Sequence, residues 1–334
     1  MKDGAGRESS IKAPADSIQV KDRIKYIFIR YNLWFILIIM VIISTIISRG
    51  IFITPRNLVN LLLQNSLTGI LATGQFLVIL TAGIDLSVGS VLAAGEMLCA
   101  KMLYSGIGIL PSFLACITLT AFFGFLNGIL ISKGRIPAFI VTLAMMGIAR
   151  SFARQITHSS SIWEIPEAFY IFGQGYIGPI PIPVILWGII FFFTLFLVTR
   201  NKIGRYIYAI GANESTARLS GVSINSIKTL VYTLSGLFCA FGAIIFIGRT
   251  QYASPDIGIW YNLDSITPVL IGGVSLSGGI GTLPNVFLGV LIMGILTNLM
   301  NIINVNLYWQ QIVKGIVLIA AVFSSSKYSS VSVK

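Results

Sequence analysis

The sequence is poor in charged residues. Its 334 residues include 23 basic and 11 acidic side chains, or 10% charged, whereas about a quarter of a typical soluble domain is charged. Hydrophobic residues make up 55% of the chain, and there are 33 glycines besides. Such a chain has too little polar surface to cover a water-soluble globule of this size. The composition therefore excludes an ordinary soluble enzyme, a disordered protein and a disulfide-stapled secreted domain.

Motifs of several enzyme classes are missing as well. The single histidine, His158, leaves histidine-based triads and H-E-x-x-H zinc sites without support. No G-x-x-x-x-G-K-[ST] motif occurs, which excludes ATP hydrolysis at a P-loop. Cys99, Cys116 and Cys239 fall within apolar runs and predict small buried side chains, with no disulfide or zinc spacing among them. We expect no cofactor and no metal on this chain.

Long apolar runs are what the sequence does contain. A membrane-spanning helix needs about 20 mostly apolar residues. The first run follows four basic residues and has no small-residue cleavage site, so it is predicted to be an uncleaved helix. The pattern predicts an all-α, polytopic membrane protein with about ten transmembrane helices, over Tyr31–Ser48, 58–81, 86–104, 109–131, 136–154, 180–199, 229–249, 262–277, 284–303 and 309–324.

The basic residues predict the orientation of these helices. With the N-terminus inside, the cytoplasmic segments hold 16 basic residues and the outer segments 6, as the positive-inside rule requires. We therefore predict an N-in, C-in chain with a cytoplasmic tail at 1–30, a transmembrane domain at 31–324 and a cytoplasmic tail at 325–334. The net charge of +12 is spread over membrane flanks and does not indicate a nucleic-acid partner.

Three ionisable residues, Asp85, Glu96 and Lys314, are predicted to lie within the membrane, where such groups are costly and often functional. Asp85 or Ser87 has the position to cap the next helix, and a role for Asp85 in a transport path is the alternative. Glu96 is predicted to face the helix bundle, either paired or as a proton site. Lys314 is predicted to extend to the outer interface.

An internal repeat links the two halves of the chain. Residues 79–89 (ILTAGIDLSVG) are echoed at an offset of 190 residues by residues 269–279 (VLIGGVSLSGG). Paired glycine-interrupted segments in the two halves of a transporter indicate its binding or gating region, although two similar turns are the simpler alternative. A G-x-x-x-G pair, Gly124 and Gly128, predicts close helix packing. The pathway or gating candidates are Gly83, Asp85, Ser87, Gly89, Gly273, Ser275, Ser277 and Gly279.

Two loops are long enough to carry a function. In the inner loop 200–228, Asn213 is predicted to cap a short helix that ends near Gly221, with Ala217, Leu219 and Ser220 as its contact surface. This helix is either a solvated connector or a handle for another subunit. The outer loop 155–179 holds five aromatic residues, which predict anchoring at the membrane interface or a docking surface for a soluble partner.

Four blocks of the sequence resemble the permease subunit of the ribose-type ABC importers of bacteria. They are residues 80–90 (LTAGIDLSVGS), the inner loop from Gly204 to Gly221, residues 272–279 (GGVSLSGG) and residues 310–315 (QQIVKG). The blocks occur in the expected order within a resemblance that runs from about residue 35 to 323. Glu96 departs from the small or apolar residue expected at its position.

The resemblance implies a transport subunit that is not itself an enzyme. A separate ATP-binding subunit would hold ATP and Mg²⁺, an extracytoplasmic binding protein would deliver the sugar, and a second permease copy would complete the pathway in the cell membrane, the inner membrane in a Gram-negative source. The resemblance implies that the ATPase-coupling helix is formed by Asn213, Glu214, Ala217, Arg218, Leu219, Ser220 and Gly221. Ribose is the first expectation for the sugar, and a proton-coupled sugar symporter that uses Glu96 is the alternative.

Overall fold

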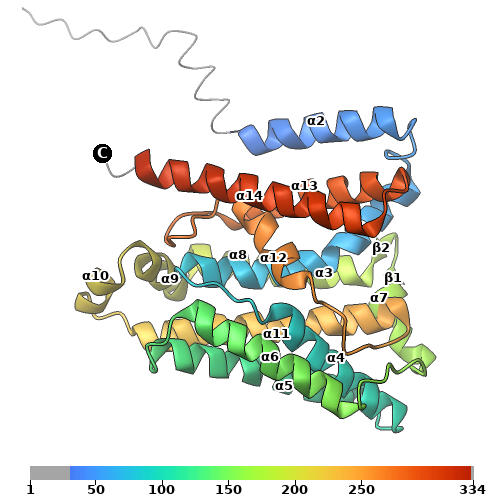
Figure 1. Cartoon of the computed structure of the whole chain (residues 1–334), viewed down its shortest axis with the longest axis horizontal. Helices are drawn as coiled ribbons and strands as arrows, with labels where there is room; N and C mark the ends of the chain where they lie inside the picture. Colours follow the sequence, from blue (N-terminus) through green and yellow to red (C-terminus); the bar gives the residue numbers. More distant parts are fainter. Residues whose placement is uncertain (1–30, 332–334) are drawn as a thin grey trace, which may run out of the picture.

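The computed structural model describes residues 31–331, which form a bundle of helices lying side by side (Figure 1). In chain order the helices are α2 (Asn32–Ile47), α3 (Pro55–Leu80), α4 (Val88–Tyr104), α5 (Ile109–Ser132), α6 (Ala138–Ile156), η1 (Glu167–Tyr170), α7 (Ile171–Gln174), α8 (Ile182–Arg200), α9 (Lys202–Ala212), α10 (Glu214–Leu219), α11 (Ile224–Thr250), α12 (Tyr261–Ile271), α13 (Leu283–Ile302) and α14 (Leu307–Val331).

Each of the ten predicted segments coincides with one of these helices. Six helices, α3, α5, α6, α8, α11 and α13, are long and apolar enough to cross a membrane, and α2 and the apolar part of α14 are shorter. Many of their large apolar side chains, such as Ile46 and Phe196, lie exposed on the outside of the bundle. An apolar exterior of this kind suits lipid rather than water. The chain is therefore a mostly helical, multi-pass membrane protein.

The eighth predicted helix is wrong at its C-terminal end. The segment 262–277 forms α12 only as far as Ile271, so that α12 has 11 residues. At 1.5 Å per residue this helix is about 16 Å long, half of what a full span requires. Pro268 lies inside α12, and Gly273 has a φ of 76°, which ends the helical path. Of residues 272–277 (GGVSLS), only Val274 and Leu276 carry large apolar side chains.

A small hairpin departs from the all-α prediction. Strands β1 (Tyr176–Ile177) and β2 (Ile180–Pro181) pair antiparallel in the outer loop. The turn between them has Gly178 at a φ of 60°, a conformation that glycine adopts without a steric penalty. The hairpin lies at the end of the bundle that is opposite α9 and α10 (Figure 1).

The most extensive contact between two helices of the described chain is that of α5 with α11. An added Cβ at Gly124 of α5 would overlap the carbonyl oxygen of Tyr232 in α11, and one at Gly128 would lie 2.6 Å from the backbone of Thr229. Neither position has room for a side chain, so these glycines allow the two backbones to touch. The predicted close packing at the G-x-x-x-G pair is confirmed.

The two ends of the described chain lie at the same end of the bundle as α9 and α10 (Figure 1). The predicted tail 1–30 lies outside the described residues. At the other terminus α14 continues as a helix to Val331, past the predicted end of the transmembrane domain at residue 324.

Candidate functional site

The first half of the sequence repeat forms an interruption between two helices. After α3 ends at Leu80, residues 81–87 run as irregular chain until α4 begins at Val88. Gly83 is buried, and the space that its side chain would fill is taken by the hydroxyl of Tyr232 in α11. Inside a membrane-spanning bundle, non-helical backbone is tolerated only where protein or a cavity surrounds it.

Asp85 is the polar centre of this interruption. One carboxylate oxygen accepts hydrogen bonds from the amide of Ser87 at 2.9 Å and from its hydroxyl at 2.6 Å, and the other accepts from the Ser235 hydroxyl at 3.1 Å. The amide of Asn127 donates to the Ser87 hydroxyl at 3.0 Å. Ser235 lies near the middle of α11, so Asp85 lies near the middle of the bundle. The carboxylate holds the interruption against α11.

The predicted capping role of this segment is only partly correct. Ser87 occupies the N-cap position of α4 but makes no side-chain cap hydrogen bond, and its hydroxyl instead donates to Asp85 and accepts from the amide of Asn127. Asp85 in turn bonds the amide of Ser87, outside the first turn of α4. The pair orders the interruption and leaves the first turn of the helix uncapped by a side chain.

The second half of the repeat is also an interruption. Residues 272–282 connect α12 to α13 without helix, and Gly273, Gly278 and Gly279 all have positive φ angles. Ser275 is buried, its side chain accepts a hydrogen bond from the amide of Ser277 at 3.2 Å, and Ser277 itself is exposed. Like residues 81–87, this segment follows the end of a helix that the repeat aligns with α3.

The two halves of the repeat meet each other. The amide of Gly279 donates to the carbonyl oxygen of Leu80 at 3.0 Å. Gly211, near the end of α9, lies against both, since an added Cβ there would overlap the Leu80 carbonyl and the Gly279 amide. The hydroxyl of Tyr208 donates to the carbonyl of Gly281 at 2.8 Å. The end of α9 is thus in direct contact with both interruptions.

The short helix α10 follows this junction at once, and its predicted ends are confirmed. The side-chain oxygen of Asn213 accepts from the amide of Thr216 at 2.9 Å, as an N-cap does. At the other end Gly221 has a φ of 80°, and the amide of Val222 donates to the carbonyl of Ala217 at 3.0 Å. This is the glycine-terminated Schellman arrangement. Because α10 has only six residues, these two caps determine where it begins and ends.

The surface of α10 differs from the predicted one. Ala217 is buried, with 4% of its surface exposed, so it packs on the protein and cannot contact a partner. Leu219 is 90% exposed, and Ser220 and Gly221 are exposed beside it. A leucine so fully exposed is not covered by any of the described residues, and another subunit could cover it.

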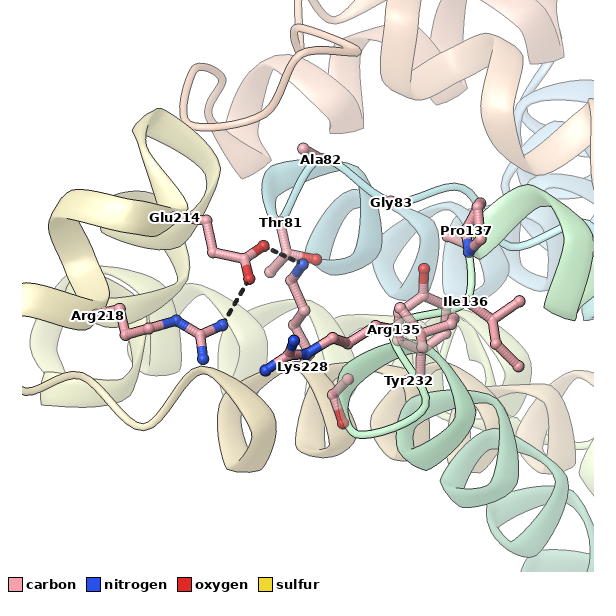
Figure 2. Close-up of a pocket in the computed structure, with 13 residues that line it drawn as sticks. Thr81, Ala82, Gly83, Arg135, Ile136, Pro137, Glu214, Arg218, Lys228 and Tyr232 are labelled. Atoms are coloured by element: carbon pink, nitrogen blue, oxygen red, sulfur yellow. Dashed lines mark hydrogen bonds and ion pairs between the residues drawn. The ribbon is translucent and has the colours of Figure 1, made fainter.

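A cavity of about 370 Å³ lies between α10 and the first interruption, lined among others by Thr81, Ala82 and Gly83. Figure 2 shows Glu214 of α10 reaching into it toward Lys228 of α11. The Lys228 ammonium lies 2.6 Å from one Glu214 oxygen, and the Arg218 guanidinium lies 3.0 Å from the other. The pair with Lys228 joins α10 to α11, whereas the pair with Arg218 lies within α10. The hydrogen bond from Lys228, with the charges of Lys228 and Arg218, lowers the pKa of Glu214 below its ordinary value.

A third irregular segment, residues 251–260, lies between two predicted helices, but its return into the bundle was not predicted from the sequence. It follows α11 and returns into the bundle, where Gly258 lies against Gly89 at the start of α4. The amide of Ser254 donates to the carboxylate of Glu96 at 3.0 Å. The guanidinium of Arg150 in α6 donates to the carbonyls of Pro255 and Ile257, at 2.6 and 2.5 Å. The contact explains Gly89, which has no room for a side chain.

The placement of Lys314 differs from the prediction as well. Its ammonium lies 3.1 and 3.3 Å from the two carboxylate oxygens of Asp264, instead of extending to an interface. Asp264 was missed because it lies three residues from the start of a predicted span and was counted with the outer loop. The signal was present in the sequence, since an acidic residue within an apolar run calls for a basic partner.

The aromatic residues of the outer loop divide into two groups. Phe169 is fully buried and packs against Phe172, with ring centroids 5.2 Å apart. Trp163 is 71% exposed and stacks on Tyr252 at 4.8 Å. The loop therefore contributes to the core with one group and to the surface with the other.

The arrangement as a whole is suited to movement rather than to covalent chemistry. The end of α9 and the two helix interruptions are in contact with one another, and the capped helix α10 follows α9 directly. A site of this design defines a membrane permease, in which a conformational change opens and closes a path.

Comparison with known proteins agrees with this class. Residues 57–322 match the family model described as "Branched-chain amino acid transport system / permease component". The chain belongs to this permease family.

Relatives within the family are sugar permeases by name. The chain is 40% identical to the ribose import permease protein RbsC of Escherichia coli K12, over 87% of this chain and 92% of the relative. It is also 40% identical to RbsC of Bacillus subtilis 168, over 88% and 92%. The D-allose transport system permease protein AlsC of Escherichia coli K12 is 34% identical, over 88% and 90%. The resemblance to ribose-type ABC permeases is thereby confirmed.

Proposed function

We propose that this chain is the transmembrane subunit of an ATP-driven importer that moves a monosaccharide, ribose first among them, into the cytoplasm by alternating access. The names of the relatives support the substrate, since two ribose permeases from distant bacteria are 40% identical to the chain over most of its length. The geometry supports the mechanism.

The observation that carries the mechanism is the contact of the α9–α10 corner with both halves of the repeat. Gly211 touches Leu80 and Gly279, and two residues later Asn213 caps α10. A partner that grips the exposed Leu219 would move α10 together with the end of α9, which precedes it directly, and with the start of α11, to which Glu214 is tied through Lys228. Moving a two-state equilibrium from 1:99 to 99:1 takes about 5.5 kcal/mol. ATP binding on a separate subunit is the proposed source of that energy.

The partners follow from the same proposal. A cytoplasmic ATP-binding subunit holds ATP and Mg²⁺ and docks on α10, while this chain carries no cofactor. An extracytoplasmic binding protein delivers the sugar at the opposite end of the bundle, and a second copy of the permease pairs with the first. The repeat is a duplicated unit of four or five helices. The chain crosses the cell membrane ten times, with both termini in the cytoplasm on the side of α10.

The common end of the described termini and α10 supports this topology (Figure 1). The short α12 crosses together with residues 251–260, which return into the bundle and contact Gly89. Half-length helices joined to buried irregular chain are typical of transporter binding regions.

The proton-coupled alternative depends on Glu96, whose surroundings favour a structural role. One carboxylate oxygen of Glu96 accepts a hydrogen bond from the amide of Ser254, the side chain is fully buried, and it does not line the cavity beside α10. A proton carrier needs access to water from at least one side, which this position does not provide.

The proposal is tested by reconstitution. The chain is purified with the ATP-binding subunit, placed in liposomes with the binding protein inside or outside, and supplied with labelled D-ribose, D-allose, D-xylose or D-fructose. We expect ATP-dependent uptake, with ribose preferred, that a protonophore leaves unchanged. Uptake that persists without the ATP-binding subunit and collapses with the protonophore would overturn the proposal in favour of a symporter.

A further inference from the structure

A second cavity, of about 340 Å³, lies between α3, α12, α13 and α14. It reaches from the outer end of the bundle, at Arg249 and Asn301, to the middle, at Asp264 and Pro268. Sites for small molecules typically have volumes of roughly 300–1,000 Å³. The cavity is therefore of a size for one small ligand, and it lies on the side of the bundle away from α10.

Its wall carries the ion pair of Asp264 and Lys314. The two side chains are 14% and 17% exposed, so each keeps a part of its polar surface toward the cavity. A carboxylate accepts up to about four hydrogen bonds and an ammonium donates three. Their mutual contacts, at 3.1 and 3.3 Å, leave both with unused capacity. Together they offer an acceptor and a donor side by side, with no net charge.

Amide side chains complete the wall. The Gln310 amide donates to the side chain of Asn301 at 2.8 Å and to the carbonyl of Val305 at 3.0 Å, which fixes both amides beside Lys314. The amide nitrogen of Asn65 donates to the carbonyl of Leu61 at 2.8 Å. Gly294 of α13 leaves the space that this side chain occupies. The cavity thus presents several oriented hydrogen-bonding groups in a mostly apolar bundle.

Holding α12 to α14 does not by itself require this pair. Charges inside a membrane are costly, and a well-packed apolar pair of similar volume holds two helices as well or better than a buried ion pair. An ion pair that faces a cavity instead provides polar contacts to what enters it. A neutral pair suits an uncharged ligand with many hydroxyl groups, since each hydroxyl both donates and accepts.

We propose that this cavity is a sugar-binding station in the outer half of the pathway, in which Asp264 accepts hydrogen bonds from sugar hydroxyls and Lys314 donates to them. The inference rests on the proposed function and adds a site for the substrate within a single permease chain. Residues 310–315, a block of the family resemblance with no assigned role, supply Gln310 and Lys314 to this site.

The test uses the complete transporter with a cysteine placed in the cavity by Thr297→Cys. Native Cys99, Cys116 and Cys239 are buried, so a small membrane-permeant thiol reagent has slow background labelling. The sugar that the uptake assay selects from ribose, allose, xylose and fructose is then added at saturating concentration. We expect it to slow labelling several-fold, and we expect Asp264→Asn in the same background to abolish that protection.

A charge exchange separates binding from a purely structural tie. If the pair only holds the helices together, Asp264→Lys combined with Lys314→Asp restores both assembly and transport. If the cavity binds sugar, the exchanged protein assembles but its KM for uptake rises roughly tenfold or more, the effect of losing one hydrogen bond to a charged group. The matched control is Asn57→Ala with Asn298→Ala, which removes a reciprocal amide pair between α3 and α13 at 3.0 Å and leaves KM unchanged.

The outcomes distinguish the two proposals. If no sugar is taken up, the proposed function fails, and this inference fails with it. If uptake is normal but the transported sugar does not slow labelling of Thr297→Cys, the station alone is overturned. Restoration of wild-type KM by the charge exchange overturns it as well.

Discussion

The carbonyl oxygen of Leu80 accepts a hydrogen bond from the amide of Gly279 at 3.0 Å. The two residues are 199 positions apart in the sequence, and each belongs to one half of the internal repeat. Gly211 packs against both. Three backbone segments therefore converge at one point, directly before the helix that we propose as the handle of the ATP-binding subunit. Contact among backbones, without flexible side chains between them, passes a small displacement on with little loss.

Gly211→Ala is expected to disturb this junction. The added methyl group would overlap the Leu80 carbonyl and the Gly279 amide, so the backbones must separate. We expect ATP-driven uptake to fall by an order of magnitude or more, while ATP hydrolysis by the complex continues. Uptake and hydrolysis measured on the same proteoliposomes give the comparison.

Two further variants make this test decisive. Gly188→Ala in α8 is the matched control, because no atom lies within 4 Å of its added Cβ, and it should leave uptake unchanged. Tyr208→Phe removes only the hydrogen bond to Gly281 at 2.8 Å and should weaken coupling in a protein that folds normally. Full coupling in both Gly211→Ala and Tyr208→Phe would contradict the role of the junction.

Leu219→Glu is expected to abolish docking of the ATP-binding subunit. Leu219 is 90% exposed, so the substitution costs the permease itself little stability, whereas a charge in an apolar contact with a partner is costly. Co-purification of the two subunits should be lost, while the thermal stability of the permease alone changes little.

Ala217→Glu provides the contrast on the same helix. Because Ala217 is buried, a glutamate there should destabilise the permease itself and reduce its amount in the membrane. Normal ATPase binding by Leu219→Glu would show that α10 docks by another surface or not at all.

Glu214 predicts a dependence of stability on pH. Its pKa is lowered from an ordinary value of 4.5, first by the hydrogen bond from Lys228 and then by the charges of Lys228 and Arg218. A carboxyl group with a lowered pKa in the folded state contributes stability above its unfolded pKa, and that contribution is lost as the pH falls through the folded pKa. Since Glu214 is 43% exposed, the contribution is small and screened by salt.

The measurement compares the melting temperature of the wild type with that of Glu214→Gln. The wild type should melt higher at neutral pH, and the difference should shrink below pH 4.5 and disappear in stronger acid. In a Lys228→Met background the difference at neutral pH should already be reduced. A difference that is constant across this pH range would exclude the ion pair as its cause.

The sequence predicted the helices well because hydrophobic length is the dominant signal in a membrane. Helices occur at all ten predicted segments, and the caps of α10 at Asn213 and Gly221 were correct because each depends on one residue with a distinct backbone preference. Faces were harder to predict. Ala217 was assigned to the exposed surface, since a helix of six residues is too short to have a readable periodicity.

Irregular backbone within the bundle was the largest omission. Residues 251–260 lie between two predicted helices but return into the bundle, and residues 272–277 at the end of the predicted eighth helix unwind. Their positions are set by distant contacts, such as Gly89 with Gly258 and Arg150 with the carbonyl of Pro255. Composition alone does not predict such contacts, because they form only when the chain is folded.

Glu96 offers a final test of the energy source. Its carboxylate holds the amide of Ser254 at 3.0 Å, and a glutamine at this position keeps an acceptor oxygen for that bond. We expect Glu96→Gln to retain ATP-driven uptake, and Glu96→Ala to lower stability by about 1–3 kcal/mol, because it leaves the Ser254 amide without its partner. Thermal unfolding and uptake are measured for both variants. A symporter that uses Glu96 as its proton site would instead lose uptake in both, so retention of transport by Glu96→Gln separates a structural hydrogen bond from proton coupling at the same residue.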